Sequence, residues 1–571
     1  MKKCLSILLA VLMLLSLCLP ALAQPAQAGG YITPTTQGSV PVVLLAGDGN
    51  RIYDADGNPA PLFDESLGDL LEGGQGDPHN TDSDFKASFL GVLKSFARGV
   101  VTGDYDKYYD DLQREVGALT ETIRMDENGE PRYGTDISPK DYETNRSRMT
   151  TPNRSGSYSI ESYHFWYDWR KSPLEIADEL DAYIEGVCAM TGFKQVGLVG
   201  RCLGTNFVLA YLAKYGYKNR IKGIGFDGGM MRGHDATSES ISGKFKTDGD
   251  SIHRYIVDQN VLFNSGIDNW VLDLVDILED SGLLDGLSAA VRKTVYDKVV
   301  EGVSSALALS TLYTIPSYWS CVSLQDYDTA MQYVFGPEGS EKRVQYAGLI
   351  EKIEAYHNTV QLRQNKLLKK FVKKGGHIGV VAKYGFQMIP ICESRNLAAD
   401  EFVSVRNTSM GARTSLVYNT LSDRYIAKRE EQGRGKYISP DRKIDATTCM
   451  YPDFTWFTKN VRHADWSVAE NEILYTVTTA DRQLTVNDFA YTQYLVRPDG
   501  AKTLVAMTTE NCDTEHWTAQ PPREEISAPA RAGRLARDNV ALIKDLLHLL
   551  RTKLEASAAK TKDKLTGALT R

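Results

Sequence analysis

Short apolar runs alternate with helical patterns in the first half of the chain. Residues 41–45 are continuously apolar and end at a Gly-Asp-Gly turn, which is typical of a buried parallel strand entering a tight loop. Further strands are predicted at residues 163–168, 194–199 and 221–226, and helices at residues 174–190 and 205–215. Strands and helices that alternate in this way predict an α/β fold, in which helices cover both faces of a mostly parallel sheet.

The same pattern divides the chain into a core and two insertions. Residues 31–229 form the first part of the predicted core, with a polar, glycine-rich insertion at about residues 55–158. Residues 230–436 are dominated by helical patterns, the clearest at 252–284 and 341–372, and are predicted to form a large helical cap over the core. The core is expected to resume over residues 437–510, with a last strand at residues 455–457 followed by a short helix.

The two ends of the chain differ in composition from the core. Residues 1–23 begin with two lysines, continue with an apolar run and end in Ala-Leu-Ala, the pattern of a cleavable signal peptide, so we expect a secreted or extracytoplasmic protein. Residues 523–571 form a basic tail in which residues 540–554 are amphipathic. That helix either packs on its own domain or makes a peripheral contact with a membrane or with anionic polymers of the cell envelope.

Charge and cysteine spacing exclude several classes of function. The chain of 571 residues carries a formal net charge of −8, and its basic residues do not interleave with aromatic ones, so nucleic acid is not an expected partner. Six cysteines remain after the leader, widely spaced and without a CxxC pair. We therefore expect no metal site and no cofactor, and at most two disulfides if one thiol is reactive.

Residues 200–204, Gly-Arg-Cys-Leu-Gly, lie between a predicted strand and a predicted helix. This is the context of a nucleophile elbow, in which Gly200 and Gly204 allow close backbone approach and the central residue exposes its side chain. Cys202 is the candidate nucleophile, since a helix N-terminus stabilises a thiolate. The alternative is a small buried cysteine in a site that has lost its chemistry. Ser409 lies in a Thr-Ser-Met-Gly segment but lacks the first glycine of an elbow.

Acyl transfer also requires an oxyanion hole, a base and an acid. The amides of Leu203, after the nucleophile, and of Asp48, after the first strand, are the predicted oxyanion donors. Chain order on this fold and the strand that precedes it favour His463 as the base. Two carboxylates after a short predicted strand are candidates for the acid, Asp441 as the first choice and Asp445 as the alternative.

Several segments of the predicted core resemble the lecithin:cholesterol acyltransferase and lysosomal phospholipase A family. The resemblance rests on VVLLAGDGN at residues 42–50, YDWRKSP at 167–173, the elbow VGRCLGTN at 199–206 and DRKI at 441–444. It implies an α/β-hydrolase fold and the hydrolysis or transfer of acyl chains at lipid esters, with Asp48 and Leu203 as oxyanion donors. The chain departs from the family at Arg201, where a histidine is expected, and at Cys202, where a serine is expected.

Together these patterns favour an extracytoplasmic acyl-ester hydrolase or acyltransferase that works through a thioester on Cys202. A large cap suits a lipid or another hydrophobic ester, because it can enclose an apolar pocket. The rival hypothesis is a degenerate member of the same fold that binds lipids or esters without turning them over. A cell-envelope peptidase or amidase is a third reading, since papain-like chemistry also uses cysteine and histidine.

Overall fold

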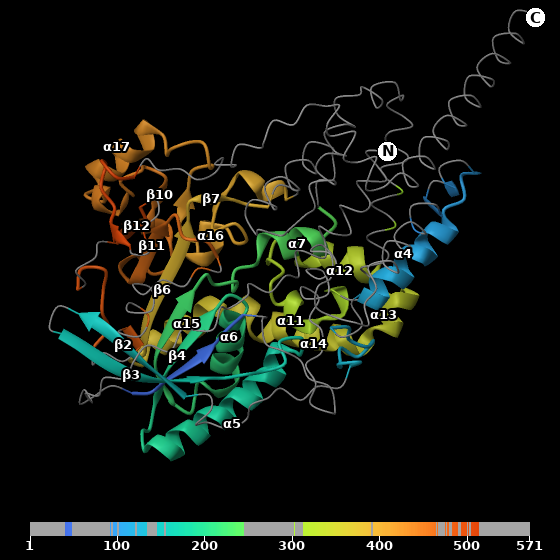
Figure 1. Ribbon diagram of the computed structural model, residues 1–571, viewed down its shortest axis with the longest axis horizontal. Helices are drawn as coiled ribbons and strands as arrows, with labels where there is room; N and C mark the ends of the chain where they lie inside the picture. The colour runs from blue at the N-terminus through green and yellow to red at the C-terminus, as the bar shows by residue number, and fades with distance from the viewer. Residues whose placement is uncertain are drawn as a thin grey trace, which may run out of the picture.

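The computed structural model describes the central part of the chain (Figure 1). The described residues are 40–47, 102–119, 123–133, 146–153, 156–244, 312–389, 392–463, 482–488, 493–498 and 504–512, with isolated positions at 92–99, 298–302, 465–478 and 501. The predicted signal peptide, the basic tail and the helical pattern at residues 252–284 lie outside them.

A nine-stranded sheet runs through the described residues in the order β13-β12-β11-β6-β5-β4-β1-β3-β2. The seven strands from β12 to β3 are parallel, and an antiparallel strand closes each edge. The predicted α/β fold is therefore confirmed. The strands are β1 (Val42–Leu45), β2 (Arg146–Asn153), β3 (Gly156–His164), β4 (Val196–Arg201), β5 (Ile221–Asp227), β6 (His377–Tyr384), β11 (Thr455–Lys459), β12 (Tyr494–Val496) and β13 (Val505–Ala506).

The strand–helix–strand core follows the predicted order closely. Helix α5 (Pro173–Thr191) begins at a capping box between Ser172 and Glu175, and ends at Gly192 in the left-handed conformation. Helix α6 (Gly204–Tyr215) follows β4 directly, and its first nine residues are buried. The two helices pack against each other, and α5 lies along the lower edge of the view in Figure 1. Apolar residues at helical spacing place one face of each helix in the core.

The described residues between β5 and β6 form helices. They are α7 (Asp235–Ile241), α11 (Pro316–Trp319), α12 (Tyr327–Phe335), α13 (Glu341–Gln345), α14 (Ala347–Thr359) and α15 (Gln364–Lys373). The predicted end of the cap at residue 436 is wrong, because β6 pairs with β5 and β11 in the middle of the main sheet. All eight residues of β6 are buried. They fall within the predicted helical cap, because a strand buried on both faces has no alternation that distinguishes it from a buried helix.

The boundary of the first insertion also shifts. Strands β2 and β3 form an antiparallel hairpin over residues 146–164, so the sheet begins before residue 158, where the insertion had been predicted to end. Helix α4 (Asp106–Leu119) lies within the insertion. Among the described residues no helix is long and apolar enough to cross a membrane.

Shorter elements follow β6 and surround the end of the sheet. They are β7 (Phe386–Gln387), β8 (Ala398–Ala399), α16 (Val405–Thr408), β9 (Arg413–Thr414), α17 (Asp423–Glu431) and β10 (Ile444–Asp445), with 3-10 turns η3 (Glu393–Asn396), η4 (Gly435–Tyr437), η5 (Ala446–Thr448) and η6 (Pro452–Phe454). Two further 3-10 turns, η1 (Leu312–Thr314) and η2 (Gln361–Arg363), precede β6. The parallel strands all end on the side where these loops gather, which is where α/β sheets place their ligand sites.

Candidate active site

Cys202 occupies the sharp turn between β4 and α6. Its φ angle is 52°, in the left-handed region that residues other than glycine rarely adopt. Its amide donates to the Asp227 carbonyl at 3.0 Å, and its carbonyl accepts from the Thr205 amide at 3.2 Å and the Thr205 hydroxyl at 2.7 Å. A non-glycine residue held in a strained conformation between a strand and a helix has the backbone geometry of the predicted elbow.

The two elbow glycines are required by close backbone contacts. A Cβ on Gly204 would lie 2.5 Å from the Ala46 carbonyl oxygen and 2.7 Å from that of Leu45. A Cβ on Gly200 would lie 2.9 Å from Cα of Thr205. The end of β1 therefore packs directly on the start of α6, which fixes the turn that carries Cys202.

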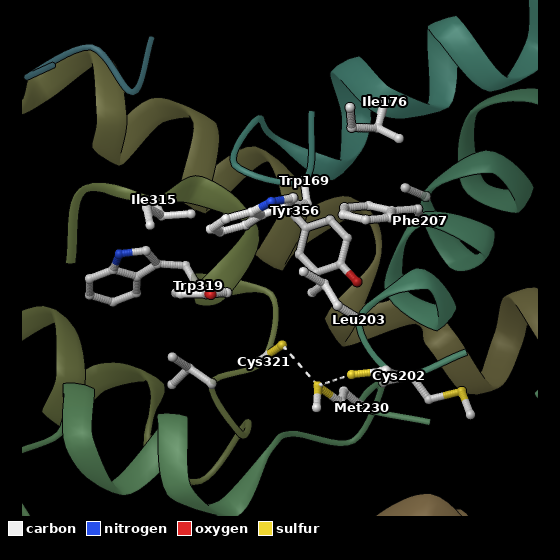
Figure 2. Close-up of a cluster of buried hydrophobic side chains, with 14 of the residues drawn as sticks. Trp169, Ile176, Cys202, Leu203, Phe207, Met230, Ile315, Trp319, Cys321 and Tyr356 are labelled. Carbon is white, nitrogen blue, oxygen red and sulfur yellow. Dashed lines mark hydrogen bonds between the residues drawn. The ribbon is translucent and has the colours of Figure 1, made fainter. Parts of the chain in front are cut away.

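The side chain of Cys202 is buried at the edge of a large apolar cluster, with 5% of its surface exposed. Its Sγ lies 3.7 Å from Sδ of Met230, and Cys321 Sγ lies 3.9 Å from the same atom (Figure 2). Figure 2 also shows residues from both the core and the cap around this point, among them Leu203, Phe207, Trp319 and Tyr356. Trp319 and Tyr356 lie between β5 and β6, so this segment, called the cap segment below, supplies part of the apolar surroundings of the thiol.

The loop after β1, where the second oxyanion donor was predicted, lies against Cys202. A Cβ on Gly47 would be 3.1 Å from Cβ and 3.2 Å from Sγ of Cys202. Asp48 itself lies outside the described residues, whereas Leu203 is the N-cap residue of α6. The hydroxyl of Tyr167 donates to the carbonyls of Ala46 and, at 3.0 Å, of Gly47, so it anchors this loop.

His463 lies in the loop after β11 and is 2% exposed on its side chain. Its Nδ1 is 2.8 Å from Oδ2 of Asp400, and its amide donates to the Asp400 carbonyl at 2.9 Å. Because the carboxylate accepts the Nδ1 proton, Nε2 is the basic nitrogen of the neutral ring. Within the described part of the chain, Nε2 of His463 is buried and has no hydrogen-bond partner.

Asp400 is built to remain ionised. Its Oδ1 accepts from the amides of Phe402 at 3.2 Å and Val403 at 2.8 Å, while Oδ2 faces His463. Burial alone would raise the pKa of Asp400, but the charge and hydrogen bond of His463 and the Val403 amide together hold it below its ordinary value. The next residue, Glu401, has a φ of 93°, so the turn that presents Asp400 is strained as well.

Cys202 and His463 approach the same dipeptide, Asp227–Gly228, at the end of β5. The Cys202 amide bonds to the Asp227 carbonyl, and a Cβ on Gly228 would lie 3.1 Å from Cε1 of His463. Gly228 has a φ of 55° and leaves room for the imidazole. The elbow that carries Cys202 and the imidazole that Asp400 holds therefore both contact this dipeptide at one edge of the sheet. In the structure the thiol contacts Met230, and Nε2 of His463 has no hydrogen-bond partner among the described residues.

Comparison with known proteins adds little to this geometry. No family model matches the chain, and no curated protein matches it. Among solved structures, it is similar to a chain described as the crystal structure of the Tle4–Tli4 complex, with 12% sequence identity and a TM-score of 0.23 over 60% of this chain and 75% of that chain. At this level of similarity no activity carries over, and the chemistry of the site must be deduced from its own residues.

The two carboxylates predicted as the acid bond to other groups, which corrects that prediction. Asp441 accepts from the hydroxyls of Ser439 at 2.6 Å and Tyr384 at 3.0 Å, and pairs with the buried Lys459 at 3.1 Å. Asp445 pairs with Arg429 at 2.8 Å. Both carboxylates stabilise the turns around β10, and the carboxylate that holds His463 is Asp400, a residue that the sequence analysis did not consider.

Asp400 was missed because β6 was missed. Once residues 377–384 are recognised as a parallel strand, the acid is sought in the loop that follows it, and the Ala-Ala-Asp-Glu segment of that loop contains Asp400. Ser409, the C-cap residue of α16, has a structural role, since its hydroxyl donates to the Val405 carbonyl at 2.5 Å. The described residues contain no group of three or more His, Cys, Asp or Glu side chains able to hold a metal ion.

The YDWR segment that carried the family resemblance is a structural element beside the site. The guanidinium of Arg170 donates to both carboxylate oxygens of Asp168, at 2.8 and 2.7 Å, and both side chains are buried. This bidentate pair fixes the turn between β3 and α5. Tyr167, at the start of the turn, then reaches the loop after β1.

All six cysteines of the described chain are buried, and no disulfide joins any two of them.

Proposed function

We propose that this protein is an acyl-ester hydrolase or acyltransferase that acts through Cys202, His463 and Asp400. The observation that carries the proposal is that a strained elbow cysteine and a carboxylate-bound histidine both contact the dipeptide Asp227–Gly228. Structural neighbours do not contribute to it. The resemblance of the elbow and of the YDWR segment to the lecithin:cholesterol acyltransferase and phospholipase A family favours a lipid ester as substrate.

The proposed reaction proceeds through a thioester. Nε2 of His463 takes the proton of Cys202, and Sγ attacks the ester carbonyl carbon to give a tetrahedral oxyanion, which the amides of Leu203 and Asp48 would stabilise. Collapse breaks the bond to the alcohol oxygen, which leaves with the proton from His463. A water or a second alcohol then adds to the thioester with His463 again as base, releases the acyl product and restores the thiol. Asp400 orients the imidazole and stabilises its charged form throughout.

An apolar acyl group fits the surroundings of Cys202. The cluster beside the thiol contains Leu203 and Phe207 from the core and Ile315, Trp319 and Tyr356 from the cap segment (Figure 2). A charged or strongly polar acyl group would lose hydration there without gaining partners. We further propose, from the sequence alone, that the protein works outside the cytoplasm and that its basic tail makes the contact with the membrane or cell envelope.

The test is hydrolysis of p-nitrophenyl esters from acetate to palmitate by the mature chain, compared with Cys202→Ala. Turnover should rise with chain length and disappear in Cys202→Ala. Cys188→Ala is the matched control, because Cys188 is also a buried thiol but lies in α5, away from the elbow, and it should retain wild-type turnover. Mass spectrometry of a slowly hydrolysed ester should trap one acyl group on the peptide that contains Cys202.

The rival function is binding of lipids or esters without turnover. Its structural support is the burial of the thiol against Met230 and Cys321, which leaves little of its surface accessible. If wild type and Cys202→Ala are equally inert on every ester, and neither becomes acylated, the enzymatic proposal fails. Native mass spectrometry of the purified protein would then be the measurement that supports a retained lipid.

A further inference from the structure

A fully buried lysine contacts the backbone of the loop that carries the candidate catalytic histidine. Lys383, in β6, has no exposed side-chain surface, and its ammonium donates to the backbone carbonyls of His463 at 3.1 Å and Asp465 at 2.8 Å. A buried ammonium is costly unless its three N–H groups are satisfied. Two of them bind the loop that carries His463, so the position of this loop depends on Lys383.

The third partner of Lys383 is Asp227, on the neighbouring strand. Their charged atoms are 3.2 Å apart, and the Asp227 carboxylate is also completely buried. The contact is an ion pair rather than a well-directed hydrogen bond, since neither Asp227 oxygen has a hydrogen-bond partner among the described residues. The charge of Lys383 is therefore what offsets the burial of this carboxylate.

Asp227 belongs to the elbow as well, through its backbone. Its carbonyl accepts the Cys202 amide at 3.0 Å. A chain of contacts thus runs from Cys202 through Asp227 and Lys383 to His463, across the ends of β4, β5, β6 and β11. Lys383 also acts on Asp400. Burial raises the pKa of the Asp400 carboxyl, His463 lowers it, and the charge of Lys383 makes a smaller contribution that lowers it further.

We propose that Lys383 is a positioning residue that joins the cysteine elbow to the histidine loop and fixes the His463 imidazole against Asp400. The role in catalysis rests on the function proposed above, whereas the effect on the His463–Asp400 hydrogen bond does not. Lys383 touches no reacting atom. It acts by holding the His463 and Asp465 carbonyls while its partner Asp227 holds the Cys202 amide.

The test compares two pairs of substitutions. Lys383→Met/Asp227→Leu removes the proposed link and leaves no buried charge unpaired. Lys459→Met/Asp441→Leu is the matched control, since Lys459 and Asp441 also form a buried ion pair, 3.1 Å apart, on the adjacent strand β11 and the loop before β10. The readouts are the low-field proton NMR resonance of the His463 Nδ1–H, assigned by its absence in His463→Ala, and the kcat and KM for the preferred ester.

The variant Lys383→Met/Asp227→Leu should lose the low-field resonance. Its kcat should fall about 100-fold while its KM stays within about threefold, because a displaced base impairs the transition state more than it impairs substrate binding. The Lys459 pair should keep the resonance and stay within about threefold of wild-type kcat. If both pairs behave alike, the proposal is overturned. If the wild type has no esterase activity, the proposed function fails, and the resonance alone decides the positioning role. If the double variant at Lys383 and Asp227 does not fold, Lys383→Gln replaces it. Glutamine keeps a hydrogen-bond donor, but it has no charge and is one atom shorter, so the same loss of the resonance is expected.

Discussion

Asp400 holds His463 at two points, by its carboxylate at Nδ1 and by its backbone carbonyl at the histidine amide. The first bond sets the tautomer and the plane of the ring, and the second fixes the backbone from which the ring projects. The two residues are 63 positions apart in the chain and follow different strands of the sheet. A pair restrained in this way is preorganised for general base catalysis.

Replacement of Asp400 by Asn should lower kcat by about 10³–10⁴-fold, because the amide favours the wrong tautomer of the imidazole. KM for a p-nitrophenyl ester should change little. Asp441→Asn is the comparison that distinguishes the structural from the catalytic carboxylate. It should leave kcat within about tenfold and lower the free energy of unfolding, since it breaks the pair with Lys459. Equal losses of kcat in the two variants would contradict the assignment of Asp400.

Removal of the Tyr167 hydroxyl should weaken the oxyanion loop without unfolding the protein. Tyr167→Phe loses the donations to Ala46 and Gly47, and we expect kcat to fall about tenfold, the equivalent of one or two hydrogen bonds at about 1 kcal/mol each. Tyr211→Phe is the control, since Tyr211 is also fully buried and its hydroxyl has no partner among the described residues. A drop in kcat of the same size in Tyr211→Phe would show that the effect is not local to the loop.

Gly204→Ala should disturb the elbow more than an ordinary glycine substitution in a helix. The new methyl group would lie 2.5 Å from the Ala46 carbonyl oxygen, a backbone atom that cannot rotate away. We expect a loss of about 1–3 kcal/mol in unfolding free energy and a clear loss of turnover. Gly117→Ala, in α4, would meet no atom closer than 3.7 Å and should be neutral or stabilising. Urea denaturation of both variants measures the difference.

The buried His234 should make the protein sensitive to acid. Burial, with a further contribution from the charge of His463, lowers the pKa of His234 to about 3 from its ordinary 6.5. Below pH 6.5 the unfolded chain therefore binds a proton that the folded chain does not, so stability falls as the pH drops from 6.5 toward 3.

The contribution of His234 to that loss should approach about 1.4 kcal/mol per pH unit well below pH 6.5. Wild type should therefore lose more unfolding free energy than His234→Gln between pH 6 and pH 4, measured by urea titration. Glu239, whose pKa is raised to about 6 mainly by burial, acts in the opposite direction, but it is present in both proteins and cancels in their difference. Parallel pH dependences for the two would show that His234 is not the responsible group.

Local pattern in the sequence predicted the elements around the elbow. The strand predicted at residues 194–199 corresponds to β4 (Val196–Arg201), and the helix predicted at 205–215 corresponds to α6. The two glycines that flank Cys202 are required by close backbone contacts at the turn. These features depend on residues close together in the chain, so periodicity and turn chemistry were sufficient to find them. The α/β class followed from the same alternation.

Pairing across the sheet could not be predicted in the same way. The sequence shows β6 as a mainly apolar segment, HIGVVAKY, with one glycine, one histidine and one lysine. A strand buried on both faces has no periodicity that distinguishes it from a buried helix. Only its place between β5 and β11 identifies it as a strand. With β6 unassigned, the loop that carries Asp400 fell within the predicted cap, and the search for an acid moved to Asp441 and Asp445.

The sequence by itself therefore determined the parallel sheet, the elbow and the choice of Cys202 and His463 as candidates, because each rests on short-range pattern or chain order. The tertiary structure decided that the Asp400 carboxylate faces His463 and that Lys383 contacts the backbone of the histidine loop. Asp400, Asp441 and Asp445 all follow short apolar segments, and nothing local separates them. Their partners are set by which strands become neighbours in the sheet, and that is a consequence of long-range packing.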